Sequence, residues 1–336
     1  MKEVRIGVIS FAHFHGYSYA RCVAELPNAK LVAVADDDEA RGRKVAEQYS
    51  VDFHQDYRKL LSREDVDAVI VTAENAKHAA IAIDAAEAGK HILCEKPLAT
   101  TLKDADAMLQ AADKAGVKLQ TAYVMRYHAV TSLVKDLISK GEIGKIVAMT
   151  GTNQLKWLVY GWFIEPALSG GGSVMDHTVH LADLMRWYTR SEAKTVYTEI
   201  GKNIHGDVKV EDNALTFVTF KNGSFGTIDG SWSRPRGFYT WGHMAMEILG
   251  TEGLIQIDAF RQNVNVIEAN PPNDRLEWHY WGCDADKEMV KGFVECVLKD
   301  KKPKASGFDG RQGVEITLAA YESAKKGSPI TLPLTP

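Results

Sequence analysis

Three side chains in two short segments have the types and spacing of an acid–base site. Lys96 lies in CEKPLA, at the expected carboxyl end of an apolar strand, and a proline restricts the backbone directly after it. Asp176 and His180 follow three glycines in GGGSVMDHTVH, and a four-residue spacing places both on one helical face. A carboxylate beside an imidazole orients the ring and raises its basicity, as a general base requires. The plainer alternatives are a solvated lysine and a polar pair that only caps or packs the helix.

The elements that must position Lys96 are predicted to form a parallel sheet with helices on both faces. Apolar runs without alternation are typical of strands covered on both sides. They occur at 4–10, 30–36, 66–73, 91–95 and 118–123. Helices with apolar residues at three- and four-residue spacings are expected between them, including 77–88 and 102–115. In such a sheet Lys96 reaches the crevice at the carboxyl ends of the strands, where ligands bind.

Beyond this sheet the pattern changes to strands in which polar and apolar residues alternate, interrupted by a few helices. The helices are expected at 129–140, 286–298 and 310–326. Asn222 and Gly223 lie between two of the strands and predict a hairpin, because that turn type needs positive φ. We therefore predict an α/β dinucleotide-binding domain over residues 1–124. A C-terminal α+β domain with a large, open, mostly antiparallel sheet should follow over 125–336.

The turn after the first strand, SFAHFHG, stands where a phosphate-binding turn would be but lacks its usual glycines. On the G-x-G-x-x-G pattern the three positions are taken by Ser10, Ala12 and His15. Ser10 and Ala12 are small enough for a phosphate to approach the backbone, and Gly16 can supply the close packing of helix on strand. The helix N-terminus remains an anion site. A nucleotide site without its glycines is thus one reading, and an ordinary βα turn is the other.

Asp36 at the end of the second strand favours the nucleotide. A carboxylate at that position can accept both hydroxyls of a ribose. Asp37, Asp38 and Glu39 follow without an immediate arginine, so a 2′-phosphate would meet repulsion. The prediction is NAD in preference to NADP, and the alternative is a solvated acidic turn at a helix N-terminus.

Two longer segments resemble the Gfo/Idh/MocA oxidoreductases, the family of glucose–fructose oxidoreductase and inositol dehydrogenase. They are AGKHILCEKPLATTLKDADAML and GGGSVMDHTVHLADLMRWY. The similarity extends through GEIGKIVAM to the closing FDGRQGVEITLAAYESAKKGSPITLPL, over almost the whole chain. It implies an N-terminal Rossmann domain, a C-terminal domain with an open sheet, and a nicotinamide cofactor.

The resemblance also implies roles for individual residues. Lys96 matches a catalytic lysine that contacts the cofactor ribose and the reacting hydroxyl, and Asp176 and His180 match the acid–base pair. The residues expected at the cofactor are Ser10, Phe11, Ala12, His13, Asp36, Thr72, Asn75, His78, Glu95, Lys96 and Arg126. Those expected at the substrate are Lys96, Tyr123, Trp162, Asp176, His177 and His180.

The sequence departs from the family pattern in two places. Ser10, Ala12 and His15 replace the glycines of the phosphate turn, and Thr178 stands where the family has glycine between the aspartate and the histidine. Thr178 adds bulk that could alter the substrate pocket. His13 and His15, together with His177 and His180, match no closed metal-ligand motif, so no metal is expected.

The implied reaction is reversible oxidation of a secondary alcohol on a sugar, polyol or cyclitol. His180 would remove the hydroxyl proton, Lys96 would stabilise the developing alkoxide, and Asp176 would orient His180. One alternative is redox-neutral glycoside cleavage around a tightly held NAD. Another is a non-enzymatic regulator that senses dinucleotide and sugar, although a sensor needs no proton-transfer pair.

Composition supports a globular protein with a small-molecule partner. Of the 336 residues 45% are apolar and 25% charged, and the net charge of −4 gives no reason to expect a nucleic-acid partner. The four cysteines form no CxxC pair, and neither a signal peptide nor a membrane-length apolar run is visible. We expect a cytoplasmic protein without a membrane partner. The open C-terminal sheet favours a homodimer or homotetramer.

Overall fold

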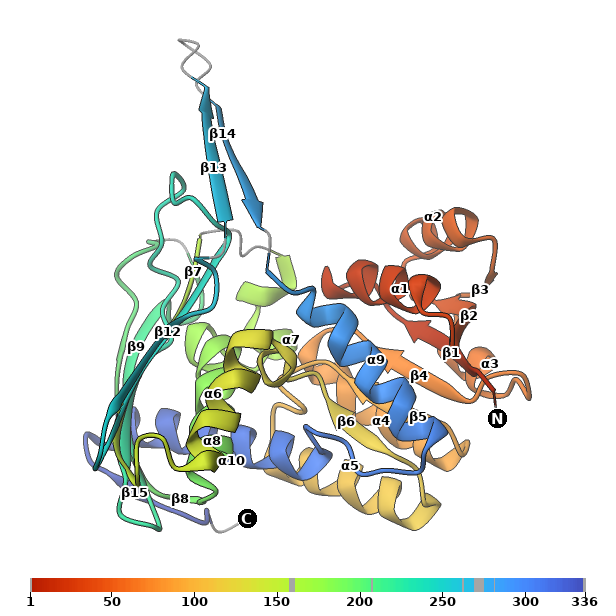
Figure 1. Cartoon of the computed structure of the whole chain (residues 1–336). Coiled ribbons are helices and arrows are strands. Elements are labelled where there is room, and N and C mark those ends of the chain that lie inside the picture. Colours follow the sequence, from red (N-terminus) through yellow and green to blue (C-terminus); the bar gives the residue numbers. More distant parts are fainter. Residues whose placement is uncertain are drawn as a thin grey trace.

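The N-terminal half forms the predicted parallel sheet. A computed structural model describes residues 2–156, 161–206, 208–261, 263–268, 275–280 and 282–334. Its first sheet has the order β3-β2-β1-β4-β5-β6, with every neighbouring pair parallel (Figure 1). The strands are β1 Val4–Ile9, β2 Ala29–Ala35, β3 Asp52–His54, β4 Ala68–Val71, β5 His91–Cys94 and β6 Leu119–Thr121. This order confirms the predicted Rossmann architecture.

Helices cover both faces of this sheet, and three of them begin at side-chain caps that the sequence contains. Asp38 accepts the backbone N–H of Arg41, and Thr101 accepts that of Asp104. The elements are α1 His15–Glu25, α2 Glu39–Tyr49, α3 Tyr57–Leu61, the 3₁₀ turn η1 Asn75–Lys77, α4 His78–Glu87 and α5 Leu102–Ala115. The helices expected at 77–88 and 102–115 are therefore present.

The second sheet has seven strands in the order β12-β11-β7-β10-β9-β8-β15. Only its β7–β10 pair is parallel among the described pairings, which confirms the mostly antiparallel sheet. The strands are β7 Ile146–Leu155, β8 Ala193–Gly201, β9 Asn213–Phe220, β10 Phe225–Asp229, β11 Gly242–Gly250, β12 Leu254–Asp258 and β15 Ile330–Thr331. Two further strands, β13 Asn263–Glu268 and β14 Arg275–Tyr280, form a separate ribbon that projects from the body (Figure 1).

The predicted hairpin joins β9 and β10. Gly223 has φ +91°, and the Asn222 side-chain oxygen accepts the backbone N–H of Ser224. The two strands then pair antiparallel from this turn.

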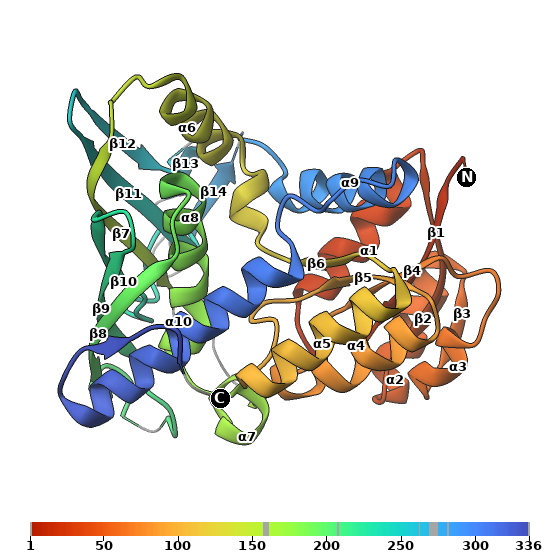
Figure 2. The same ribbon diagram turned by 90° about the horizontal axis from the view of Figure 1, so that it is seen from below.

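Helices cover one face of the second sheet, on the side that faces the Rossmann sheet (Figure 2). Those in contact with the sheet are α6 Ala129–Lys140, the π-helical turn η4 Val174–Thr178, α8 Val179–Thr189 and α10 Gly307–Lys326. The 3₁₀ turns η2 Val124–Tyr127 and η3 Gly161–Ile164 and helix α7 Pro166–Ser169 are the other helical elements of this part of the chain. Helix α10 packs on both α5 and α8, so it joins the two halves of the molecule. No helix among the described residues is long and apolar enough to span a membrane.

Helix α9, Ala285–Leu298, belongs by its packing to the Rossmann half. Its buried face, including Met289 and Phe293, joins the core formed by β1 and α1. The Asp286 carboxylate accepts the Ser18 hydroxyl at 2.6 Å, and Figures 1 and 2 show α9 beside α1. The predicted boundary at 124/125 falls between β6 and β7, and the first core also takes α9 from the C-terminal part of the chain.

Candidate active site

Lys96 and Asp176 meet across the two halves of the molecule. Lys96 directly follows Glu95 at the carboxyl end of β5, and Asp176 lies in η4 beyond the glycine run. The Lys96 Nζ donates to Asp176 Oδ1 at 2.6 Å and to the Asp176 backbone carbonyl at 3.2 Å. Only 6% of the Lys96 side chain and 14% of the Asp176 side chain are exposed, so solvent screens this pair weakly.

Asp176 is held as a carboxylate by its neighbours. Its second oxygen accepts the Trp232 indole N–H at 3.1 Å and lies 3.2 Å from His177 Nε2. Burial alone would raise the pKa of Asp176, but Lys96, His177 and the indole outweigh burial and hold that pKa well below its ordinary value. Asp176 is therefore a fixed negative charge beside Lys96.

The expected contact between Asp176 and His180 is replaced by one between Asp176 and His177. The four-residue argument assumed a regular α-helix, whereas residues 174–178 form a π-helical turn before α8 begins. The hydrogen bonds described for Asp176 go to Lys96 and Trp232, and the imidazole within ion-pair distance is that of His177. The prediction that Asp176 directly orients His180 is therefore wrong for this structure.

His180 projects from the first turn of α8 and is 8% exposed. Its Nδ1 is buried without a hydrogen-bond partner in the described part of the chain, and its ring lies 6.2 Å from that of Tyr123. Burial lowers the pKa of His180 well below 6.5, and the ammonium of Lys96 acts in the same direction. A neutral imidazole at neutral pH can accept a proton.

Other buried polar groups near these residues also lack partners among the described residues. They are the Tyr123 hydroxyl, the His177 Nδ1 and the Thr178 hydroxyl. Buried polar atoms normally pair with protein, water or a ligand. Of these atoms, His177 Nδ1 belongs to the residue that contacts Asp176, whereas the Tyr123 hydroxyl packs against Gly313 of α10 and the Thr178 hydroxyl against Gly230.

The glycine run lets the chain before η4 approach the segment before β9 closely. A Cβ at Gly172 would lie 2.0 Å from the Glu211 backbone oxygen, so only glycine fits there. The Glu211 carboxylate accepts the backbone N–H groups of Gly172 and Val174 and the hydroxyl of Tyr321. Sequence reasoning missed Glu211 and Tyr321, because they are far from the glycines along the chain and share no motif with them.

The turn after β1 lacks the usual glycines, and other residues give its backbone the shape of a phosphate turn. Ser10 adopts φ +71°, the left-handed conformation that a first glycine would supply, and its hydroxyl accepts the Ala12 backbone N–H. A Cβ at Gly16 would lie 2.7 Å from the Thr72 hydroxyl oxygen, so Gly16 permits the close contact of helix and strand. Thr72 in turn donates to the Ser10 carbonyl at 2.6 Å. The turn keeps the required backbone shape with different residues.

Asp36 is occupied by donors of this protein, among them an arginine five residues further along the chain. Arg41, one helical turn further on, donates to both Asp36 oxygens at 2.6 and 2.8 Å. The backbone N–H groups of Phe11 and Asp38 donate to the same carboxylate. Asp36 therefore joins the phosphate turn to α2, and a ribose would compete with Arg41 for it.

Two other predicted cofactor residues pair with the backbone. The Asn75 amide donates to the Ser169 carbonyl at 2.8 Å and so ties η1 to α7 of the other half. Both His78 nitrogens lie within 3.1 Å of backbone carbonyls, those of Pro97 and Ala73, and the ring is fully buried. These contacts favour a positioning role for His78, because neither of its nitrogens is left for a cofactor, whereas the buried Asn75 Oδ1 has no partner among the described residues.

Trp162 and His13 pack at the phosphate turn together with Phe163. The Trp162 indole N–H donates to the Ala12 carbonyl at 3.1 Å, which links η3 to the phosphate turn. Its ring stacks on Phe163 at 3.9 Å, and the His13 ring lies 5.2 Å from that of Phe163. The structure thus places Trp162, predicted on the substrate side, beside both the turn and the buried His13.

Arg126, the remaining predicted cofactor residue, lies in an ion-pair network between η2, α8 and α10. It donates to both oxygens of Asp183 at 2.6 and 2.7 Å, and to Asp309 at 2.9 Å. A further bond goes to the Lys304 carbonyl. Burial raises the pKa of Asp183 to about 6, and Arg126 acts against this. These contacts favour a structural role for Arg126, in place of the predicted cofactor contact.

Replacing Asp183 with alanine should destabilise the protein by about 3 kcal/mol, because the buried Arg126 loses its bidentate partner. Asp309 still pairs with Arg126, which keeps the loss at the lower end for such pairs. Urea unfolding followed by circular dichroism measures the change. Asp65→Ala, which breaks a largely exposed pair with Arg63, is the control and should move the midpoint little. Equal effects of the two substitutions would contradict the role of the network.

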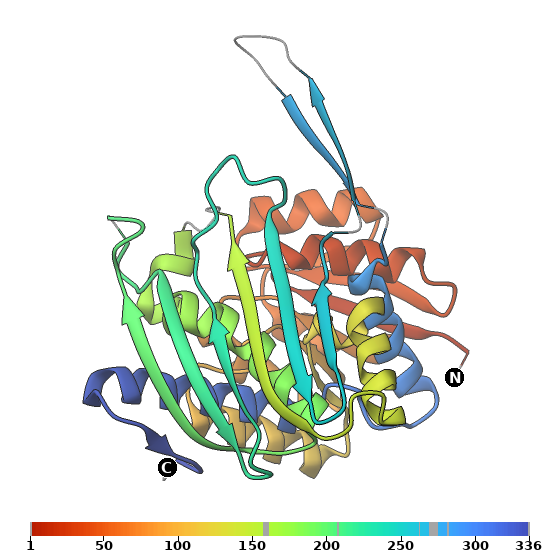
Figure 3. The same cartoon turned by 60° about the vertical axis from the view of Figure 1, so that its left-hand side comes forward.

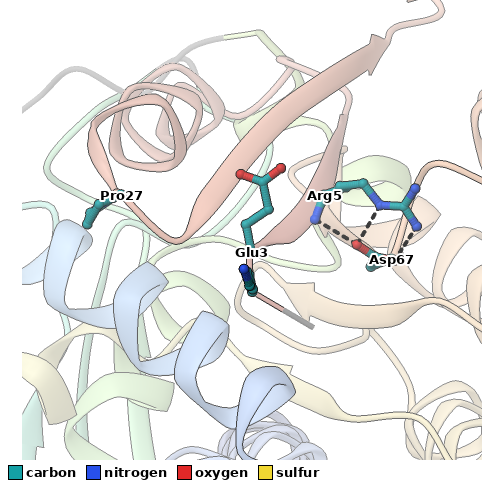
Figure 4. A pocket seen from close by; sticks show the side chains of 5 residues that line it. Glu3, Arg5, Pro27 and Asp67 are labelled. Atoms are coloured by element: carbon teal, nitrogen blue, oxygen red, sulfur yellow. Dashed lines mark hydrogen bonds and ion pairs between the residues drawn. The ribbon is translucent and has the colours of Figure 1, made fainter.

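A surface hollow lies at the opposite end of the Rossmann strands from Lys96. Lys2, Glu3, Arg5, Pro27 and Asp67 line it, at the amino ends of β1 and β4 (Figure 4). Arg5 and Asp67 already pair there at 2.7 Å. Ligands of such sheets bind at the carboxyl ends, so the site around Lys96 is the candidate active site.

Family models match both halves of the chain. Residues 4–123 match a model described as "Oxidoreductase family, NAD-binding Rossmann fold", and residues 131–256 match the "GFO/IDH/MocA C-terminal domain". Together the two matches cover more than half of the sequence.

Full-length relatives and a solved structure agree with these matches. The scyllo-inositol 2-dehydrogenase (NAD(+)) of Bacillus subtilis is 29% identical, over 98% of this chain and 96% of its own. The myo-inositol 2-dehydrogenase of Thermotoga maritima is also 29% identical, over 98% of both chains. The crystal structure of a probable dehydrogenase from Thermotoga maritima has a TM-score of 0.85 at 28% identity, covering 98% of both chains. With its two matched halves and its NAD-binding Rossmann fold, the chain belongs to the Gfo/Idh/MocA oxidoreductase family.

Proposed function

We propose that this enzyme oxidises a secondary alcohol of a cyclitol, sugar or related polyol with NAD. The observation that carries the proposal is the convergence of a buried lysine, its carboxylate partner and a neutral histidine at the carboxyl ends of the Rossmann strands. The relatives named above are inositol 2-dehydrogenases, which supports an alcohol of a polyhydroxylated ring.

We infer a role for each residue in this reaction. The neutral His180 accepts the hydroxyl proton, and the Lys96 ammonium stabilises the negative charge that develops on the oxygen. Lys96 has three N–H donors, so it can keep Asp176 as a partner while it donates to the substrate. Asp176 holds Lys96 in place, and the nicotinamide supplies the hydride acceptor when bound.

His177, which contacts Asp176, is a residue that could bind a neighbouring hydroxyl of the same substrate. Its Nδ1 is buried without a hydrogen-bond partner among the described residues. A polyhydroxylated ring offers a hydroxyl that would satisfy it.

The direct test is incubation of the full chain with NAD and a panel of inositols, monosaccharides and aryl glycosides. Formation of NADH with a cyclitol or a free sugar supports the proposed dehydrogenase. Release of the aryl group without net NADH would instead establish redox-neutral glycoside cleavage. Binding of NAD without either reaction would favour a sensor and contradict the proposal.

We propose that the cofactor is NAD in preference to NADP, with Asp36 as the discriminating residue. Replacing Asp36 with serine should lower kcat/KM for NAD by about 10- to 100-fold, the value of a hydrogen bond to a charged group. Activity with NADP should rise, because Arg41 is released and can pair with a 2′-phosphate. Steady-state kinetics with both cofactors measures the change. Arg41→Ala is the control and should keep the NAD preference, and an unchanged cofactor ratio in the Asp36 variant would contradict the assignment.

We also propose that a second copy of the chain covers the outer face of the seven-stranded sheet. The described helices lie behind this sheet or beside its edge (Figure 3). Large apolar side chains on that side are exposed, among them Leu215 at 56% and Phe225 at 40%. Exposed apolar faces of this kind are typical of association surfaces.

Replacing Phe217 with glutamate should reduce the oligomer to a smaller species. Phe217 is 38% exposed, and its ring lies 5.7 Å from that of Phe225 on the neighbouring strand. A buried charge there would have no described partner and would be costly to desolvate. Sedimentation velocity measures the mass, with Leu133→Glu, an exposed leucine on α6, as the control. A wild-type chain that sediments as a monomer would contradict the proposed interface.

A further inference from the structure

We propose that His13, His15 and Glu95 form a binding site for a divalent transition-metal cation of the zinc class, next to Lys96. The three side chains come from two segments, the phosphate turn with the start of α1 and the end of β5. One potential ligand atom from each lies within 4.8 Å of the other two. Two imidazoles and one carboxylate are a common ligand set for such ions.

The distances are close to those a bound ion requires. Ligand atoms each about 2.1 Å from a tetrahedral zinc lie about 3.4 Å apart. His15 Nδ1 and Glu95 Oε1 are 2.7 Å apart, and the rings of His13 and His15 have centroids separated by 4.3 Å. Small side-chain movements would therefore bring three ligands to one ion, and its remaining positions could take water or an oxygen of a ligand in the cleft.

Neighbouring groups already hold Glu95 in the orientation that a ligand needs. The Tyr19 hydroxyl donates to Glu95 Oε1 at 2.5 Å, and the Lys96 backbone N–H donates to Oε2 at 2.7 Å. Glu95 is fully buried, and these hydrogen bonds hold its carboxylate in one orientation. Hydrogen bonds of this kind orient the ligands of known metal sites.

His13 is fixed by its packing. It is 1% exposed, and its Nδ1 accepts the His15 backbone N–H at 3.2 Å. If Nδ1 is the ligand, this long bond is the contact that the metal replaces.

The local charge can accommodate a cation. The carboxylates of Glu95, Asp176 and Asp286 act on the two histidines, against the single ammonium of Lys96. A divalent ion bound here would pair with the buried Glu95 carboxylate.

The prediction of no metal was based on the spacing of four histidines and did not include Glu95 as a ligand. Glu95 is 80 residues from His15 and was assigned to the cofactor. The parallel sheet brings the end of β5 beside the turn after β1, with β4 between the two strands. The structure therefore offers a ligand set that histidine spacing alone does not show.

The test measures metal content of the tag-free full chain, without substrate or turnover, so its result is independent of the proposed reaction. Wild-type protein is equilibrated with zinc sulfate, dialysed, and analysed by mass spectrometry for zinc per chain. Competition with a chromogenic chelator gives the affinity, and cobalt(II) reports the ligand field by its visible spectrum. The variants are His13→Ala, Glu95→Gln and Tyr19→Phe, with His54→Ala as a matched histidine control in the same domain.

The expected result is one zinc per wild-type chain. Affinity should fall by at least about 100-fold in His13→Ala and Glu95→Gln, and by about 10-fold in Tyr19→Phe. His54→Ala should bind like the wild type. Circular dichroism identifies any variant that fails to fold, and His13→Ala then serves in place of Glu95→Gln. The proposal would be overturned if the wild type held no more zinc per chain than the dialysis buffer accounts for. Equal zinc affinity in the wild type and in His13→Ala would also overturn it.

Discussion

Replacing Lys96 with methionine should lower kcat by about 1,000-fold, as loss of a group that stabilises transition-state charge does. The methionine keeps much of the side-chain volume but removes the ammonium that faces Asp176. The developing alkoxide then has no positive partner in a buried site, where such charges interact strongly. NADH binding should persist, because the phosphate turn is held by Ser10, Thr72 and Gly16.

The measurement is steady-state oxidation of the best substrate, with NADH binding followed separately by fluorescence. Lys90→Met is the matched control. Lys90 directly precedes β5, at the amino end of this strand, and donates to the Arg63 and Val66 carbonyls. That variant should keep its turnover. Normal turnover in Lys96→Met with intact NADH binding would end the proposed mechanism.

Replacing His180 with asparagine should lower kcat by about 100- to 10,000-fold, the usual contribution of a positioned general base. Asparagine retains polarity but cannot accept the hydroxyl proton.

The pH dependence of the wild-type rate should reflect the titration of His180. Burial lowers the pKa of His180 below its ordinary 6.5, and a base must be deprotonated to act. The rate of alcohol oxidation should therefore stay level as the pH falls from 8 to about 6, before the acid limb begins.

His177 provides the comparison that decides between the two imidazoles. It lies 3.2 Å from Asp176 and has a buried, unpartnered Nδ1. His177→Asn should raise KM more than it lowers kcat if His177 binds substrate. Loss of kcat in His177→Asn, with little loss in His180→Asn, would show that the proton passes to His177 and would contradict the assignment.

The strands and helices were largely predictable because their signals are local. The apolar runs at 4–10 and 91–95 became β1 and β5 within one residue, and the helices at 102–115 and 129–140 have the expected bounds. The Asn222–Gly223 turn needed only its own backbone preference. The short elements β3 and α3 were missed, because three to five residues carry too little periodicity.

The site was predictable where chain order places a residue at a strand end, and unpredictable where the outcome depends on a partner. Lys96 is at the carboxyl end of the sheet, as expected, because it follows a parallel strand. Asp36 was at the right position, but its pairing with Arg41 depended on how α2 begins. Arg126 was assigned to the cofactor from resemblance, whereas folding surrounds it with Asp183 and Asp309.

By itself, the sequence determined a Rossmann sheet, a second open sheet, and a lysine and a histidine capable of proton chemistry. These follow from side-chain periodicity and residue type, which operate over a few neighbouring positions. Only the tertiary structure decided that Asp176 pairs with Lys96 and His177, and that Glu95 joins His13 and His15. The physical reason is that a π-helical turn changes which side chains align, and a parallel sheet brings together strand ends that are far apart along the chain.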